Sequence, residues 1–360
     1  MRSESYSRYT EGHRCRWRRL CGYHFNGKGL QSTVPSLDLM VGSTLHKCLE
    51  TVLSAPSPVG QETATKLLEP LIAGHRETVT RTIPSDTPTE NGKQSACLVE
   101  VLAHAWTRIT LPWIRENFDV ISSEKMVRWN AEAPTGTVTF WNKSDLVCRN
   151  KKTGVKSVHD FKSLGYWDDE SSEQWHFNIQ MYLGAYMEEM TSKQPEKVAE
   201  YYIHPLVKGN EKYPSPLAFP WCAPAVTPMG KPHFSLVWRK GFKRDWIYEH
   251  QQPSEFIWSL PANQLVKFVP VAGPYGTDEE MARDFIEGAL TEDEYWHSNL
   301  KDVDWKKWSN PETQVMLVSR FPRSYQCWDF KRLCDFHRLC FRRKGWEDPF
   351  TVGYEPRSFR

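Results

Sequence analysis

The sequence lacks any long uninterrupted run of apolar residues. No stretch approaches the ~18 consecutive apolar residues of a membrane-spanning helix, so we expect none. The first twenty residues, MRSESYSRYTEGHRCRWRRL, are basic without an apolar core, and a secretory signal is not expected. Internal repeats and long low-complexity runs are also missing. The 360 residues therefore predict one large domain or two small ones.

A large net charge is missing too, since the formal charge is only +2 at pH 7. Bulk charge therefore does not predict a nucleic-acid partner. Local basic clusters attract phosphate backbones, although a solvated charged surface is an equally good interpretation. Two such clusters occur, one formed by Arg14, Arg16, Arg18 and Arg19 and the other by Arg338, Arg342, Arg343 and Lys344.

Hydrophobic periodicity predicts an α/β or α+β core with a helical wrap. Helices are expected over 36–54, 61–75, 95–117 and 172–190, with a break at Pro112 and a surface loop over 80–95. Strands are expected over 120–129, 136–150, 155–164, 197–207 and 233–240, with a proline-rich loop over 213–232. The turn KKTG joins the second and third strands as a hairpin.

Two carboxylates and a lysine on this hairpin form the first candidate site. Asp160 and Lys162 lie two residues apart on one strand, so both side chains face the same side of the sheet. Asp145 on the preceding strand can lie beside Asp160. A divalent cation relieves the repulsion of paired carboxylates, and Mg²⁺ suits oxygen ligands. The Lys162 ammonium would then orient or deprotonate a water, or stabilise charge on a phosphate.

An Asp-x-Lys triplet alone is weak evidence, because one occurs about once by chance in a chain of this length. Its context strengthens it: the triplet lies on a strand after a hairpin and before an amphipathic helix. His46 adds an imidazole, a common metal ligand, within an apolar helical pattern. Taken alone, His46 would more often be an ordinary helix histidine.

The sequence resembles the RecB-like branch of the PD-(D/E)xK nucleases. Gly42-Ser43-Thr44-Leu45-His46 is similar to its GxxxH motif, SDLV supplies Asp145, and HDFKS supplies Asp160 and Lys162. Glu124 and Gln180 stand where the family has a strand glutamate and a helix glutamine. The resemblance implies a restriction-endonuclease-like mixed central sheet flanked by helices. It also implies an Mg²⁺- or Mn²⁺-dependent deoxyribonuclease, with exonuclease action commonest in the family.

The resemblance also implies roles for these residues. The metal ligands would be His46, Asp145, Asp160 and the backbone carbonyl of Phe161. Lys162 would be the catalytic lysine, Glu124 an accessory residue beside the metal, and Gln180 with a tyrosine a DNA contact. The family tyrosine position falls on Gly184, so Tyr182 and Tyr186 are the candidates, and core packing of Tyr182 is an equal alternative.

Nine cysteines, an odd number, without an export signal disfavour a disulfide framework. The sequence resembles the iron–sulfur members of the branch (AddB and the CRISPR-associated adaptation nucleases), in which one early and three late cysteines hold a 4Fe–4S cluster. That resemblance implies Cys15, Cys327, Cys334 and Cys340 as ligands. Cys21 rivals Cys15. Zn²⁺, with His13 or His337 replacing a cysteine, rivals iron, and buried free thiols are the third interpretation.

These interpretations divide the chain into an N-terminal segment with a cluster cysteine (1–35), a nuclease core (36–240) and a helical cysteine-bearing region (241–360). The expected partner is DNA, as single strands or duplex ends, in recombination, repair, or phage- or CRISPR-related processing, with a helicase or recombination partner and no membrane. The expected compartment is the cytoplasm of a prokaryotic or phage-infected cell. The alternatives are a non-catalytic nucleic-acid-binding protein stabilised by an iron–sulfur or zinc site, and a structural zinc protein.

Overall fold

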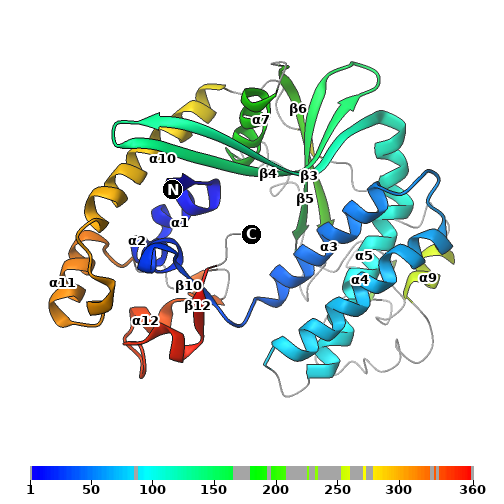
Figure 1. Ribbon diagram of the computed structural model, residues 1–360. Coiled ribbons are helices and arrows are strands. Elements are labelled where there is room, and N and C mark those ends of the chain that lie inside the picture. The colour runs from blue at the N-terminus through cyan, green and yellow to red at the C-terminus, as the bar shows by residue number, and fades with distance from the viewer. Residues whose placement is uncertain are drawn as a thin grey trace. The chain divides into compact units, whose positions relative to one another are not determined.

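The computed structural model is a mixed α/β protein with a mixed sheet flanked by helices (Figure 1). It describes residues 2–84, 88–164, 179–192, 196–207, 225–226, 232–233, 253–259, 271–272, 279–324, 328–329 and 332–357. The chain forms two compact units. Unit 1 comprises Met1–Val34, Val127–Asn142 and Glu279–Arg360, and unit 2 comprises Pro35–Met126 and Lys143–Asp278. Among the described residues, none of the helices is both long and apolar enough to cross a membrane.

Three long helices build the core of unit 2. They are α3 (Leu37–Leu53), α4 (Gln61–Thr82) and α5 (Pro88–Asn117). Their buried apolar residues recur at helical spacing and pack into one cluster. Arg115 of α5 ties the end of α3 in place by donating to the backbone oxygens of Val52, Leu53 and Ala55. The helices predicted over 36–54, 61–75 and 95–117 are confirmed.

The loop predicted over 80–95 is wrong over most of its length. Helix α4 continues to Thr82 and α5 begins at Pro88. Proline is favoured in a first helical turn, because the N–H that it lacks has no partner there. The break predicted at Pro112 is also wrong, since α5 runs through it. Burial of the adjacent Leu111 and Ile114 outweighs the cost of about 3 kcal/mol for an interior proline.

A mixed sheet lies beside these helices. Strands β4 (Gly136–Asn150), β5 (Lys156–Leu164), β6 (Val198–Val207) and β9 (Val271–Ala272) pair in that order, and β3 (Phe118–Ala133) pairs with β4. These strands belong to unit 2, except for residues 127–133 of β3 and 136–142 of β4, which belong to unit 1. The β4–β5 pair is antiparallel, as the hairpin predicts, and β5–β6 is parallel. Helix α7 (Ile179–Thr191) provides the crossover from β5 to β6. The strand predicted over 233–240 lies outside the described residues except at His233, in β8 (Pro232–His233).

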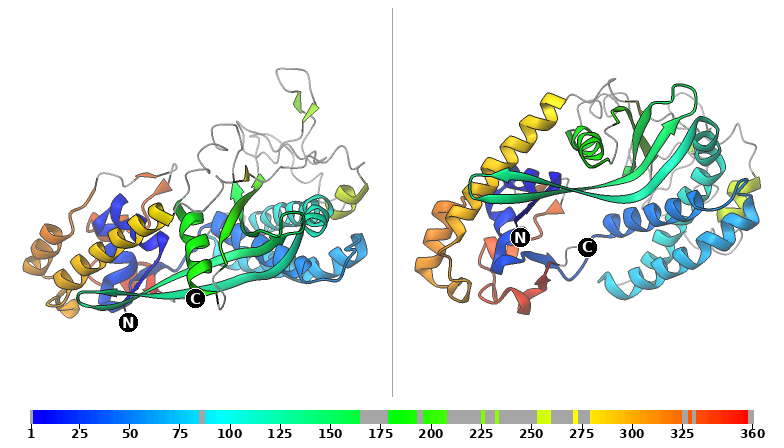
Figure 2. Two further views of the ribbon diagram at one scale, coloured as in Figure 1. Left: turned by 90° about the horizontal axis from the view of Figure 1, so that it is seen from above. Right: turned by 45° about the horizontal axis from the view of Figure 1, so that its top comes forward.

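The two faces of β5 carry different chemistry. Phe161 faces the helical cluster of α3, α4 and α5, together with Leu146 of β4. Asp160 and Lys162 alternate with Phe161 and face the other side, where Lys162 meets Gln180 of α7. Figure 2 shows α7 and the α3–α5 helices on opposite sides of these strands. Helix α7 therefore packs on the polar face of β5.

A buried chain of polar side chains runs through the core side of the sheet. Ser157 Oγ lies 3.0 Å from His159 Nε2, and His159 Nδ1 lies 2.9 Å from His204 Nε2. Burial lowers the pKa of His159 well below its usual range and that of His204 to about 3. Burial also lowers the pKa values of His75 and His104 to about 4. All four imidazoles are therefore neutral in the folded protein at neutral pH.

We expect these histidines to make unit 2 acid-labile. Their folded-state pKa values lie below the unfolded value of about 6.5, so the unfolded chain binds protons first as pH falls. Their contribution to the free energy of unfolding is complete above pH ~6.5. It is lost as the pH falls toward ~4, by up to about 1.4 kcal/mol per pH unit for each histidine. Urea unfolding at pH 7.5 and 5.5 measures this loss. His204→Gln should reduce it and the exposed His297→Gln should not; equal stability at both pH values contradicts the prediction.

Unit 1 contains the beginning and the end of the described chain. Strand β2 (Leu30–Ser32) pairs antiparallel with β12 (Tyr354–Pro356). An aromatic core includes the buried side chains of Trp17, Trp296 and Phe321. The α-helices in the described part of this unit are α1 (Tyr6–Arg14), α2 (Arg16–Arg19), α10 (Glu279–Leu300), α11 (Pro311–Arg320) and α12 (His337–Cys340).

Candidate metal centre

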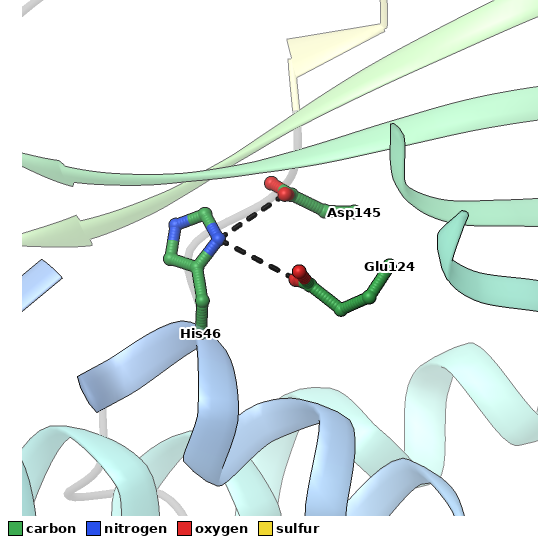
Figure 3. Close-up of side chains that lie close together, drawn as sticks. All are labelled: His46, Glu124 and Asp145. Carbon is green, nitrogen blue, oxygen red and sulfur yellow. Dashed lines mark hydrogen bonds and ion pairs between the residues drawn. The ribbon is translucent and has the colours of Figure 1, made fainter. Parts of the chain in front are cut away.

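Three side chains from three elements of unit 2 converge at one point. His46 of α3, Glu124 of β3 and Asp145 of β4 each offer a ligand atom, and these atoms lie within 4.8 Å of one another (Figure 3). His46 Nδ1 is 3.1 Å from Asp145 Oδ1 and 3.7 Å from Glu124 Oε1. An imidazole and two carboxylates are a donor set that divalent cations bind in proteins.

Backbone packing explains how Asp145 and His46 reach this point. The β4–β5 register, in which Leu146 faces His159, places Asp145 beside Asp160. The second Asp145 oxygen, Oδ2, accepts a hydrogen bond of 2.7 Å from the backbone nitrogen of Phe161. One turn before His46, Gly42 lets α3 approach the end of β5, because a Cβ there would lie 3.3 Å from Ser163 Oγ.

Glu124 reaches the centre through an unusual backbone conformation. Its φ is +51°, in the left-handed region that residues other than glycine rarely adopt. Its carboxylate forms an ion pair with Lys143 of β4 as well as the contact with His46. Such strain costs about 1–3 kcal/mol, persists only where the surroundings impose it, and concentrates at functional sites.

Electrostatics within the centre favour a cation. Burial lowers the pKa of His46, but the hydrogen bonds that its ring N–H donates to the Asp145 and Glu124 carboxylates outweigh it and raise the pKa to about 10. Burial raises the pKa of Glu124, yet His46 and Lys143 bring the net shift downward. The carboxylates therefore hold a positive charge, here a proton on His46. A bound cation would displace that proton, so we expect metal affinity to decrease as the pH is lowered.

Lys162 and Asp160 lie beside this centre on β5. Lys162 Nζ is 2.7 Å from Asp160 Oδ2 and 3.4 Å from Gln180 Oε1 on α7. Burial raises the pKa of Asp160 to about 6, the ammonium of Lys162 opposes that shift, and Asp145 adds to it. Asp160 and Lys162 therefore form an ion pair.

The three residues that converge in the structure are not the same set as the ligands predicted from the sequence. Glu124 belongs to it, whereas the Asp160 carboxylate pairs with Lys162. Phe161 offers its backbone N–H to Asp145, and the roles of Asp160 and of the Phe161 carbonyl as ligands stay predictions. The predicted DNA contacts Tyr182 and Tyr186 are both buried, and Tyr182 packs edge-on against Tyr201, as the core-packing alternative expects.

A group of thiols gathers in unit 1. Cys15, Cys21 and Cys340 are buried and Cys334 is half-buried in one hydrophobic cluster. Burial raises the pKa of the Cys21 thiol well above its usual range, and the neighbouring thiols of Cys340, Cys334 and Cys15 raise it further. Thiolates are the ligands that the predicted metal or cluster needs, and a bound cation would compensate their charge. Of the predicted ligands, Cys327 lies outside the described residues.

The basic clusters predicted from sequence have different surroundings. Near the start, Arg16 is 3.3 Å from Glu292, and Arg18 forms an ion pair with Glu11. Arg19 is fully buried and lies over the ring of Trp296. The side chains of the later cluster are all exposed, namely Arg338, Arg342, Arg343 and Lys344. The later cluster is therefore the more accessible of the two to a phosphate backbone.

A scan against protein-family models found no match for this chain, and a search of the curated proteins found no similar sequence.

Proposed function

We propose that this protein is an Mg²⁺- or Mn²⁺-dependent deoxyribonuclease of the RecB-like PD-(D/E)xK type, with a restriction-endonuclease-like core. The observation that carries the proposal is the convergence of His46, Glu124 and Asp145 within 4.8 Å, with Lys162 beside them. The substrate is DNA, and exonuclease action on ends or single strands is the expected mode. Participation in recombination, repair, or phage- or CRISPR-related processing is part of the proposal.

The side chains divide the work of phosphodiester hydrolysis among them. His46, Glu124 and Asp145 would hold the cation, which polarises the phosphate and makes water a better nucleophile. Lys162 donates hydrogen bonds to charge that develops on the scissile phosphate. Asp160 and Gln180 hold the Lys162 ammonium from two sides, at 2.7 and 3.4 Å. Fixing the ammonium before the reaction lowers the reorganisation that the transition state requires.

We also propose that cysteines of unit 1 hold a 4Fe–4S cluster, with Zn²⁺ as the rival metal. Support comes from Cys15, Cys21, Cys334 and Cys340, which lie in one cluster. A cluster ligated from both ends of the sequence would fasten the first and last segments of unit 1 together. The pairing of β2 with β12 already joins those segments through the backbone.

Replacement of Lys162 tests the nuclease proposal. Lys162→Ala should lower the rate of Mn²⁺-dependent digestion of end-labelled single- and double-stranded DNA by about 10²-fold, the usual loss for one transition-state donor. The exposed turn residue Lys152 provides a matched control as Lys152→Ala. A circular single-stranded substrate separates end-dependent from internal cleavage.

Equal digestion by the wild-type protein and Lys162→Ala would remove Lys162 from the mechanism. A wild-type protein that binds DNA yet leaves it intact with either cation would favour the non-catalytic alternative.

A further inference from the structure

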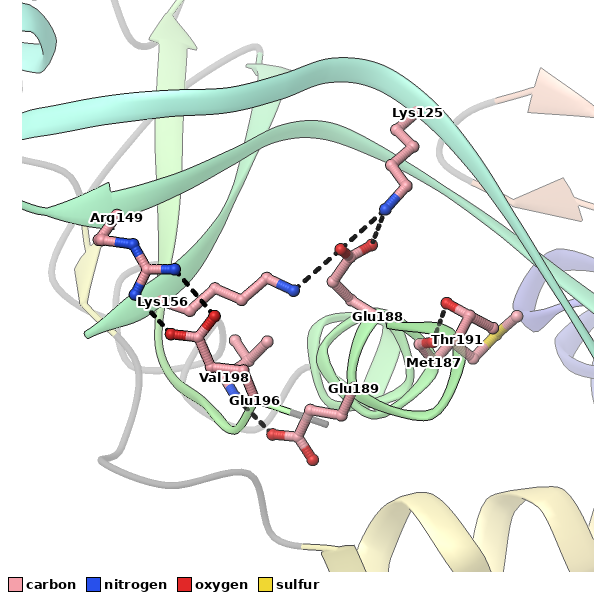
Figure 4. Close-up of polar contacts among 9 residues, drawn as sticks. All are labelled: Lys125, Arg149, Lys156, Met187, Glu188, Glu189, Thr191, Glu196 and Val198. Carbon is pink, nitrogen blue, oxygen red and sulfur yellow. Dashed lines mark hydrogen bonds and ion pairs between the residues drawn. The ribbon is translucent and has the colours of Figure 1, made fainter. Parts of the chain in front are cut away.

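An ion triad centred on a buried carboxylate lies on the polar side of the sheet, apart from the metal centre. Glu188 of α7 contacts Lys125 of β3 through both carboxylate oxygens, at 2.9 and 3.2 Å, and Lys156 of β5 at 3.0 Å. Figure 4 shows the Glu188 carboxylate between the two ammonium groups. The side chains of Glu188 and Lys156 are 2% and 4% exposed, and that of Lys125 is 42% exposed.

Buried charges are costly to desolvate, and an apolar group of similar size often gives equal or greater stability. The location of this triad indicates a role other than stabilising the fold. Lys156 and Lys162 lie on the same face of β5, six residues or about 20 Å apart. Glu188 and Gln180 of α7 meet these two lysines. Helix α7 is thus held at both ends along the face that carries Asp160.

The third member of the triad immediately follows the strained ligand. In a regular strand Glu124 and Lys125 would point to opposite faces. Here Glu124 contacts Lys143 and His46, while Lys125 contacts Glu188. His46 of α3 and Glu188 of α7 lie on opposite sides of these strands, so the two adjacent side chains make contacts on both sides of the sheet. The positive φ of Glu124 lies next to the Lys125–Glu188 contact, and such strain persists only where the surroundings impose it.

We propose that Glu188 is a positioning residue: by clamping Lys125 it holds the backbone of Glu124 in its left-handed conformation and its carboxylate at the metal centre. The inference rests on the proposed function, because it assigns Glu124 to a cation site. Without the Glu188–Lys125 contact, the backbone of Glu124 can leave the left-handed region, which would move its carboxylate away from His46. Residues that orient metal ligands in this way alter affinity without touching the metal.

The two lysines of the triad supply a matched pair of variants. Lys125→Met and Lys156→Met are the same chemical change, and each leaves Glu188 one ammonium partner. Only Lys125 adjoins Glu124. Substitution of Glu188 itself would leave Lys156 buried without a counter-charge, and the protein would be at risk of unfolding.

Titration with Mn²⁺ alone, followed by electron paramagnetic resonance, tests the proposal on the 360-residue protein. We expect Lys125→Met to weaken Mn²⁺ binding by roughly 10- to 100-fold. Lys156→Met should change it by less than about twofold, as for a substitution remote from the site. Lys125→Arg keeps the charge and should restore most of the affinity. Melting temperatures identify any variant that fails to fold.

The outcomes separate this inference from the proposed function. Wild-type protein that binds Mn²⁺, with Lys125→Met and Lys156→Met shifted alike or not at all, overturns the positioning role and leaves the metal centre standing. If Lys125→Met does not fold, Lys125→Gln is titrated in its place, under the same criteria. Wild-type protein without Mn²⁺ affinity overturns both.

Discussion

Asp145→Asn is expected to abolish cation-dependent DNA hydrolysis, by about 10³-fold or more. The cation contributes several kcal/mol of transition-state stabilisation, and ~4 kcal/mol corresponds to about 10³-fold in rate. Asp145 holds a central position, because one carboxylate oxygen is 3.1 Å from His46 and the other accepts the Phe161 N–H at 2.7 Å. An amide at this position keeps only one oxygen ligand and no charge.

The substitution should leave the fold intact, which makes the result interpretable. The asparagine oxygen can still accept the Phe161 N–H, and its NH₂ group can donate to a neutral His46. The variant should therefore melt near the wild-type temperature while Mn²⁺ binding, measured by calorimetry, is lost. Because His46 carries a proton in the cation-free centre, binding to the wild-type protein should release protons and strengthen as pH rises. Full activity in Asp145→Asn would falsify the assignment of this centre as catalytic.

Cys21→Ser is expected to remove nearly all metal from the thiol cluster of unit 1. Cys21 is fully buried, and its pKa responds to three neighbouring cysteines, Cys340, Cys334 and Cys15. We therefore expect it to be a ligand, in contrast to the set implied by the sequence resemblance, which uses Cys15. A protein purified without oxygen should absorb near ~400 nm if the cluster contains iron and sulfide, and the variant should be colourless.

Cys48→Ser is the matched control for this experiment. Cys48 is equally buried, but it lies in α3 of unit 2 and burial alone raises its pKa to about 12. Its substitution should leave the metal content unchanged. Elemental analysis for iron and zinc distinguishes the rival metals. Since the free energy of metal binding to a structural site contributes to folding, unit 1 of Cys21→Ser should also unfold at lower temperature. Wild-type protein with neither metal contradicts the proposed cluster, and a Cys21→Ser protein with full metal content reassigns the ligand to Cys15.

Local sequence patterns predicted much of the fold correctly. The hairpin of β4 and β5 follows from two β-rich segments joined by KKTG, and the helical spacing of Leu45, Leu49 and Val52 defines α3. The errors at 80–95 and Pro112 have one cause. Glycine and proline report local backbone preference, whereas both positions belong to a helix that packing against α3 and α4 stabilises.

The candidate centre, too, is predicted in part by the sequence and depends in part on the tertiary structure. A period of two residues places Asp160 and Lys162 on one face of β5, and that relation needs only the sequence. The neighbours of each carboxylate depend on strand register and helix docking. The resemblance implied that Glu124 lies at the metal with His46. The ion pair of Asp160 with Lys162, and the left-handed backbone that brings Glu124 to His46, are seen only in the three-dimensional arrangement.

The sequence by itself determined the order of helices and strands, the shared face of Asp160 and Lys162, and the residue types available to a metal. These properties depend on contacts between near neighbours in the chain. The tertiary structure alone decided that Glu124 has a left-handed backbone beside Lys125, that Glu188 is buried between two lysines, and that Cys21 lies among the late cysteines. Each of these depends on residues far apart in sequence, whose contact free energy outweighs local preference only once the chain has folded.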